Sequence, residues 1–275
     1  MREALLLPLQ QLWTHRDLLR ELTARELKIR YRRSFLGFFW TLLTPIYQVV
    51  IYTVVLKYIM GWGGRNLSVD ILVALIPWTF FSVGVLNSCS AVIRYRNVVK
   101  KVYFPRHMLP LSTVLANLVH LLLSTAVLLV FFLIRPVAFH ETFLMLIPLI
   151  IGQTLLVAGL SFFTACAHTY YQDVEHLLGN LMQVAMFLSP VIYSAERLNG
   201  HPPLYKHLFM CNPMAVYCES WRGMLMGVPA GPHGDLIYQL PDPLYLALAC
   251  GISVVVFLLG LTFWQRHEWR FPEVI

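Results

Sequence analysis

The chain has 275 residues, of which only 13% are charged and 58% are hydrophobic. Ordinary globular proteins carry about 25% charged residues, so this composition excludes a typical water-soluble protein. A net charge of +7 would fit a protein that binds nucleic acid, but the basic residues flank long apolar stretches and form no basic domain. The composition therefore predicts one membrane-embedded domain with little mass outside the bilayer.

Six apolar stretches, almost free of charge in their interiors, dominate the sequence. Each reaches or approaches the roughly 20 residues that a helix needs to cross a bilayer. Because lipid cannot hydrogen-bond to backbone groups, we expect all six to be helices of one bundle. The predicted fold class is thus an all-α integral membrane protein with six transmembrane helices. The stretches cover residues 35–59, 71–93, 108–134, 143–167, 177–194 and 244–264.

The basic residues indicate how these spans are oriented. Fifteen of the Lys and Arg residues lie before the first span, between the second and third, or after the last, and six lie in the segments of the opposite side. Cytoplasmic loops carry the excess of Lys and Arg, so we expect both termini in the cytoplasm. The short segment around Asp173 and Glu175 would also be cytoplasmic, although it has no Lys or Arg.

Residues 1–34 are predicted to form a cytoplasmic N-terminus, followed by a transmembrane domain over 35–275. An amphipathic helix over 10–34 is expected to lie on the cytoplasmic membrane surface, with basic residues on much of its other side. The alternative is a basic flank that only orients the first span. The apolar arc of the helix consists of Leu18, Leu19, Leu22 and Ile29.

The loop 94–107 contains five cations and no acidic residue, yet apolar side chains interrupt the charge. A loop that only sets topology does not need apolar residues. We therefore expect a short helix that docks on a soluble protein and is ended by Pro105. The residues expected to take part are Val98, Val99, Lys101, Val102, Tyr103, Phe104, Pro105 and Arg106.

The segment 195–243 is expected on the outer side. Its middle part, 204–226, is apolar and aromatic but too short and interrupted to span. Asn212 followed by Pro213 is typical of a helix start, with Asn as the N-cap. We expect this part to re-enter the outer half of the membrane, which favours a gate or vestibule. The candidate gate residues are Asn212, Pro213, Tyr217 and Trp221.

Polar and aromatic residues recur on one face of the first and fifth spans. Such a face can line a conduit for sugars, because rings stack on pyranose faces and amides exchange hydrogen bonds with hydroxyls. It can equally serve helix packing, and the third span has a comparable stripe from Thr113 through Asn117 and His120 to Ser124. The sequence leaves both interpretations open. The channel candidates are Phe38, Thr41, Gln48, Tyr52, Asn180, Gln183, Phe187 and Ser194.

No Asp, Glu, Lys or Arg lies in the interior of a span, whereas ion-coupled carriers usually place ionisable residues there. None of the five lysines follows the glycine that a Walker A motif requires. A transporter built this way needs energy from elsewhere. If ATP drives it, the ATP and Mg²⁺ are bound by a separate ATPase subunit, with no cofactor in this chain.

The sequence contains few candidate catalytic residues. His168, Asp173, Glu175 and His176 cluster between the fourth and fifth spans. A metal or acid–base site is possible there, but a capped, hydrogen-bonded turn is the preferred interpretation, so no metal site is expected.

Four short motifs, in this order within a six-span layout, resemble those of ABC-2 type exporter membrane subunits, specifically the exporters of polysaccharides, O-antigens, capsules and teichoic acids. One difference is Gln172 in Tyr-Gln-Asp-Val, where that family commonly has Arg, which puts in doubt an ion pair at this turn. The motifs are Arg30–Gly37 leading to Trp40 and Pro45, Val102–Arg106 followed by Leu109-Pro110, Leu188–Tyr193, and Asn212-Pro213.

The resemblance implies a homodimer that pairs with two copies of a soluble ABC ATPase. Loop 94–107 would be the coupling helix, and the helix over 10–34 the interfacial helix beside it. ATP-driven closure would open a channel between protomers for a glycan linked to undecaprenyl diphosphate. Arg32 and Arg33 would attract the lipid diphosphate. Alternatives are a permease for a small amphipathic drug or lipid, and a membrane enzyme acting on lipid-linked sugars.

Overall fold

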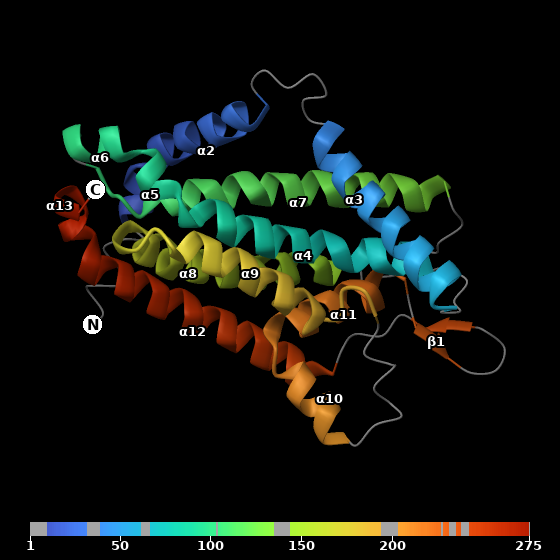
Figure 1. Ribbon diagram of the computed structural model, residues 1–275. Helices are drawn as coiled ribbons and strands as arrows, with labels where there is room; N and C mark the ends of the chain where they lie inside the picture. The colour runs from blue at the N-terminus through green and yellow to red at the C-terminus, as the bar shows by residue number, and fades with distance from the viewer. Residues whose placement is uncertain are drawn as a thin grey trace.

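The computed structural model describes residues 10–31, 39–61, 67–102, 104–134, 144–193, 203–226, 228–230, 235–237 and 242–274. Within them the chain is almost entirely helical, and the long helices run side by side (Figure 1). This confirms the predicted helical class. The N-terminal half contains α2 (Arg16–Tyr31), α3 (Phe39–Thr53), η1 (Val54–Ile59), α4 (Leu67–Cys89), α5 (Ala91–Arg94), α6 (Arg96–Lys101) and α7 (Met108–Ile134).

The C-terminal half contains two short strands that the sequence did not predict. They pair antiparallel, with Val228 opposite Ile237. In Figure 1, α6 and α13 lie at one end of the bundle, and α10 and α11 lie toward the other. The elements are α8 (Leu146–Tyr170), α9 (Val174–Phe187), α10 (Pro203–Met210), α11 (Pro213–Leu225), β1 (Val228–Ala230), β2 (Asp235–Ile237), α12 (Pro243–His267), η4 (Glu268–Arg270) and α13 (Phe271–Val274).

Four helices among the described residues are long and apolar enough to cross a membrane, and they correspond to the second, third, fourth and sixth predicted spans. The first predicted span appears as α3 continued by the π-helix η1. The fifth is only the 14-residue helix α9, about 21 Å long, which ends at Phe187. Among the described residues, four of the six predicted spans are therefore helices long and apolar enough to cross a membrane.

Helices α8 and α12 form the closest helix pair described. A Cβ atom added to Gly260 would lie 2.3 Å from the carbonyl oxygen of Gly159, so only glycine permits this approach. One turn away, the rings of Phe162 and Trp264 pack with centroids 5.8 Å apart. The opposite face of α12 exposes Leu and Val side chains, which is the composition expected of a surface that faces lipid.

Helix α2 forms where the amphipathic pattern predicted a helix, but its apolar arc contacts protein. Leu22 is buried, and Leu18 and Leu19 pack against the same cluster, which lies at the start of α7 and in α5 and α6. Ile29 is the one member of the arc left exposed, at 54%. The expectation that this arc faces the membrane is therefore wrong for its three leucines.

Helix α11 begins as the sequence predicted. The side-chain oxygen of Asn212 accepts a hydrogen bond from the backbone N–H of Met214 at 3.0 Å, and Pro213 is the first helical residue. Most of α11 is buried, since it packs against α4, α8 and α12. Cys218 lies inside this packing and Cys211 is exposed before it, both as free thiols.

Candidate coupling region and transport pathway

The loop after α4 folds into the short helix that the sequence predicted. The chain turns at Ser90 and Tyr95, and α6 follows with Val99 buried beneath it. The helix ends at Lys101 because Val102 adopts an extended backbone, with φ −128° and ψ 133°. Pro105 lies beyond that point, so the prediction that it ends the helix is wrong.

The predicted docking residues divide into two groups. Val99 is buried, and Val98 and Phe104 pack against the cluster that includes Leu22 and Tyr95, so these three hold the loop on its own chain. Val102 is 55% exposed and Lys101 is exposed beside it, which leaves both available to a partner.

Among the remaining residues of this loop, Arg106 contacts the C-terminal part of the chain. Arg106 donates a hydrogen bond to the carbonyl oxygen of Glu268, and Pro105 is half-buried. Tyr103 lies outside the described residues, as do Arg32 and Arg33.

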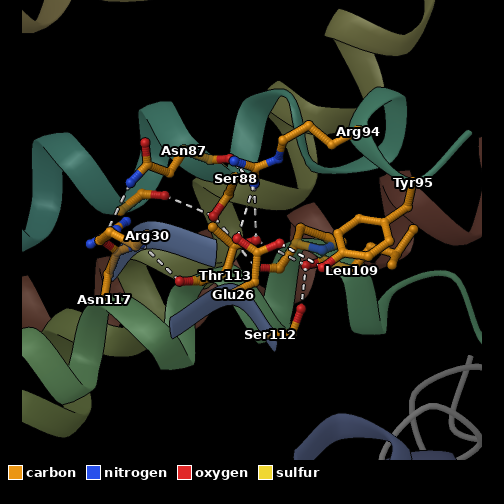
Figure 2. A network of polar contacts seen from close by, with 12 residues as sticks. Glu26, Arg30, Asn87, Ser88, Arg94, Tyr95, Leu109, Ser112, Thr113 and Asn117 are labelled. Atoms are coloured by element: carbon orange, nitrogen blue, oxygen red, sulfur yellow. Dashed lines mark hydrogen bonds and ion pairs between the residues drawn. The ribbon is translucent and has the colours of Figure 1, made fainter. Parts of the chain in front are cut away.

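A network of polar contacts joins α2 to the corner between α5 and α6, as Figure 2 shows. The hydroxyl of Tyr95 donates to Glu26 Oε1 at 2.8 Å, and Arg94 Nη2 lies 3.6 Å from Glu26 Oε2. Burial, together with the hydrogen bond to Glu26, raises the pKa of Tyr95 to about 12. Tyr95 therefore stays a hydrogen-bond donor throughout the physiological pH range.

The same network reaches α7 through the stripe that the sequence singled out on the third span. Arg30 Nη2 donates to Asn117 Oδ1 at 3.0 Å, and Asn87 Nδ2 donates to the same oxygen at 3.4 Å. Arg94 donates to the carbonyl oxygen of Asn87 at 2.8 Å and to the Thr113 hydroxyl at 3.4 Å. On α7, therefore, polar residues serve helix packing, which was one of the two interpretations left open.

The channel candidates of α9 lie on its exposed side. Phe187 is 65% exposed, and Asn180 and Gln183 are also exposed, whereas Leu178 and Met182 on the other side of the helix are buried. These polar and aromatic side chains therefore lie on the side of α9 that faces away from the packed core in the described part of the chain. They remain available to line a pathway.

The candidates of the first span are less fully described. Tyr52 on α3 donates to the sulfur of Met186 on α9 at 3.8 Å, which brings the two predicted channel helices into contact, and Gln48 is half-buried. Thr41 belongs to α3, but its side chain falls outside the described part of the chain, as do Phe38 and Ser194.

The expected gate residues lie in tightly packed positions. Tyr217 and Trp221 are completely buried, and the Tyr217 hydroxyl is 2.7 Å from Ser253 Oγ on α12. Asn212 Nδ2 donates to Ser189 Oγ at 3.1 Å, so the start of α11 contacts the turn after α9.

The sequence did not identify a buried ionic cluster at this end of the bundle, which we call the Arg222 cluster. Arg222 on α11 lies with its Nε 3.0 Å from Asp70 Oδ1 in the first turn of α4, and with its Nη1 3.0 Å from Glu219 Oε1. The sequence signal that could have revealed this cluster was the pair Glu219 and Arg222, an acid and a base three residues apart in an otherwise apolar segment. Asp70 was missed because the second span was predicted to begin after it, whereas α4 begins at Leu67.

The cluster of possible ligands between α8 and α9 forms a different contact from the one expected. His168 Nε2 lies 3.6 Å from Glu175 Oε2. The turn is hydrogen-bonded as preferred, with the N–H of Val174 donating to the carbonyl oxygen of Tyr171 at 3.2 Å, but the N-cap residue Asp173 makes no capping hydrogen bond with its side chain. Among the residues that the structure describes, no group of three or more His, Cys, Asp or Glu could hold a metal ion.

The family model described as ABC-2 type transporter matches residues 17–226 of the chain. This chain belongs to the ABC-2 type transporter family. The match begins in α2 and ends just after α11, so it includes the coupling region, α9 and Arg222 of this ABC-2 protein. Arg94, Asn180 and Arg222 therefore lie within the family domain, whereas α12 lies beyond it.

Curated relatives align with this ABC-2 protein over nearly its whole length. The O-antigen export system permease protein RfbA of Klebsiella pneumoniae is 27% identical over 260 residues, covering 94% of this chain and 95% of that protein. RfbA of Myxococcus xanthus is 29% identical over 268 residues, covering 97% and 98%. The capsule polysaccharide export inner-membrane protein CtrC of Neisseria meningitidis is 22% identical over 272 residues, covering 94% of each chain.

Proposed function

We propose that the chain is the membrane permease subunit of an ATP-driven exporter. It moves a lipid-linked polysaccharide, of the O-antigen, capsule or teichoic-acid type, outward across the bacterial plasma membrane. The main support is the near full-length similarity to permeases whose names state the export of O-antigen or capsule polysaccharide. The chain thus acts as a transport subunit and not as an enzyme.

In this proposal all six predicted helices cross the membrane, with α3–η1 and α9 as the shorter crossings and α10–α11 as a re-entrant segment on the outer side. Both termini lie in the cytoplasm. The fifteen-to-six distribution of basic residues supports this orientation.

The energy comes from two copies of a soluble ABC ATPase, which hold the ATP and Mg²⁺. Its docking position is the end of α6, where Val102 and Lys101 are exposed together. An exposed apolar side chain beside a cation suits a protein partner better than water alone. The permease itself forms a homodimer, and the exposed faces of α3 and α9 are available to enclose the conduit.

The conduit uses Asn180, Gln183 and Phe187 together with Gln48 and Tyr52. Amides and aromatic rings can hold and release successive sugar units without any fixed charge. This chemistry distinguishes a glycan pathway from the ionisable relay of an ion-coupled pump.

Deletion of the chain from the bacterium that encodes it, followed by complementation, tests the proposal. Phe187→Ala should lower surface glycan by roughly tenfold, the effect of about 1.4 kcal/mol on a barrier. Leu177→Ala, on an exposed α9 residue off the stripe, is the matched control and should leave surface glycan unchanged. Normal surface glycan in the deletion strain, with loss of drug or lipid export instead, would contradict the glycan assignment.

A further inference from the structure

The turn that follows α9 is buried although its backbone forms no regular helix. It comprises residues 188–193, and Ser189, Pro190, Val191 and Ile192 within it are all buried. Buried carbonyl groups need hydrogen-bond partners, because leaving one without a partner costs the full desolvation of that group. In an apolar setting the partners have to come from the protein.

A single side chain supplies three of these partners. Arg222 Nη1 donates to the carbonyl oxygens of Pro190 and Tyr193, the latter at 2.7 Å, and Nη2 donates to that of Val191 at 2.7 Å. The side chain of Arg222 is only 5% exposed. Its guanidinium carries five N–H groups in a rigid plane, which allows one side chain to serve several acceptors.

The orientation of this guanidinium is fixed from the other side. Asp70 and Glu219 each place a carboxylate oxygen 3.0 Å from it, and Nε also donates to the backbone carbonyl of Asp70 at 3.3 Å. The two carboxylates neutralise a cation that would otherwise be buried alone. The result is one connected contact between the end of α9, the first turn of α4 and α11.

We propose that Arg222 is a positioning residue that joins the end of α9 to α11, so that these two elements move together and Phe187 is held in place on the exposed face of α9. The inference rests on the proposed function, because the conduit belongs to that proposal. A displacement of α11 reaches the conduit through the contact between Arg222 and the end of α9. Asn212, which donates to Ser189 at the start of the same turn, adds a second connection between the two elements.

Cysteine accessibility in the purified protein tests this connection independently of transport. The five native cysteines are replaced by Ala, Ile192→Cys is introduced, and the rate of maleimide labelling in detergent is measured with and without Arg222→Lys. Lys keeps the charge but has three donors on a point-like head group, so it cannot serve three carbonyls and two carboxylates. We expect labelling of the introduced thiol to be at least about tenfold faster, a change of about 1.4 kcal/mol in the opening of the turn.

Two controls separate the release of the turn from loss of the fold. A protein that keeps Cys218 as its single cysteine, buried in α11, should stay unlabelled in both backgrounds. Asp70→Asn leaves the three carbonyl contacts in place, so the thiol introduced by Ile192→Cys should stay protected. Equal labelling rates with Arg and Lys at position 222, or faster labelling of Cys218 as well, would overturn the proposal.

A charge-neutral variant, Arg222→Met with Asp70→Asn and Glu219→Gln, covers the case in which Arg222→Lys fails to fold. It removes the donors without leaving a buried charge, and it should also release the turn.

Export is then measured in cells. If the unmodified chain supports no glycan export, the proposed function fails while the labelling result stands. If Arg222→Lys releases the turn but exports normally, the positioning role fails.

Discussion

The α6 end of the helical bundle and the end that holds α11 lie apart in Figure 1. Each holds an arginine paired with carboxylate, but the two pairs differ in burial and geometry. At the end formed by α2 and α5, Arg94 is 40% exposed and lies 3.6 Å from Glu26. At the end formed by α11, Arg222 is 5% exposed, meets two carboxylates at 3.0 Å and donates to three carbonyls of one turn.

This difference indicates how the two ends can behave. The Arg94–Glu26 pair is the looser of the two at its arginine, although the Glu26 side chain is only 10% exposed. Its charge interaction is therefore partly screened by salt, while the leucines of α2 and the Tyr95 hydrogen bond still hold that helix in place. A buried arginine with every partner in place cannot be displaced without leaving charges and carbonyls unpaired. If the ATPase docks at α6, as proposed, the looser ion pair lies at the driven end and the fixed one lies where α9 meets α11.

Removal of the fixed contact should have the largest effect. Arg222→Met leaves Asp70, Glu219 and three carbonyls without their donor, which should cost about 3–5 kcal/mol of folding free energy. The midpoint of thermal unfolding in detergent and the folded fraction on size exclusion measure the loss. Partial recovery in the charge-neutral triple variant would attribute part of it to the stranded carboxylates, whereas an unchanged midpoint would contradict the comparison.

A pH dependence should appear at the α2 end. His107 is buried beside α7, and burial, with a further contribution from His15, lowers the pKa of His107 to about 4. The unfolded chain binds this proton at higher pH than the folded chain, so stability should fall as pH drops from about 6.5 to about 4, by at most about 3 kcal/mol. His107→Phe should flatten this slope in unfolding curves, and an identical slope in both proteins would contradict the assignment.

Loss of the charge at Glu26 should have a smaller effect. Glu26→Gln keeps an acceptor for the Tyr95 hydroxyl, and Arg94 is 40% exposed and 3.6 Å away, so the substitution should cost less than about 1 kcal/mol. The difference from the unmodified protein should disappear near about 1 M salt, where the Debye length is about 3 Å. Asp70→Asn is the contrasting variant, because its buried pair should be insensitive to salt. A large, salt-independent loss of folding free energy for Glu26→Gln would contradict the comparison, because the two ends of the bundle would then behave alike.

The smallest effect on stability is expected for Val102→Asp, since this side chain is more than half exposed and leaves α6 intact. The same substitution should prevent copurification of the ATPase, because a carboxylate would replace the apolar contact. Ile29→Asp, at an equally exposed position on α2, is the control and should retain the ATPase. Retention of the ATPase by Val102→Asp would remove this loop from the coupling role.

Local rules predicted the elements whose causes lie close in sequence. Asn212 and Pro213 start α11 as expected, because an N-cap side chain and the backbone N–H that donates to it are only two residues apart. The apolar arc of α2 was found from its periodicity, yet periodicity states only which face is apolar and not whether lipid or protein covers it. Phe104 was assigned to a partner for the same reason, and it packs on its own chain.

Long-range contacts could not be read from the sequence. The Arg222–Asp70 pair joins residues 152 positions apart, and the carbonyls that Arg222 serves carry no residue-specific signal. The end of α6 at Lys101 was not predicted, because Pro105 was assigned as the residue that stops the helix. The charge-free spans, by contrast, could be predicted directly from the sequence, because a helix that crosses lipid needs apolar side chains on every turn.

Transport in reconstituted vesicles tests the central claim most directly. The purified chain is placed in liposomes with and without its ATPase, and the ATP-dependent movement of a lipid-linked glycan across the bilayer is measured. Transport that requires both the ATPase and ATP, with the chain alone inactive, is the predicted result. Uphill movement or chemical turnover of the glycan by the chain alone would contradict a passive permease driven by a separate subunit.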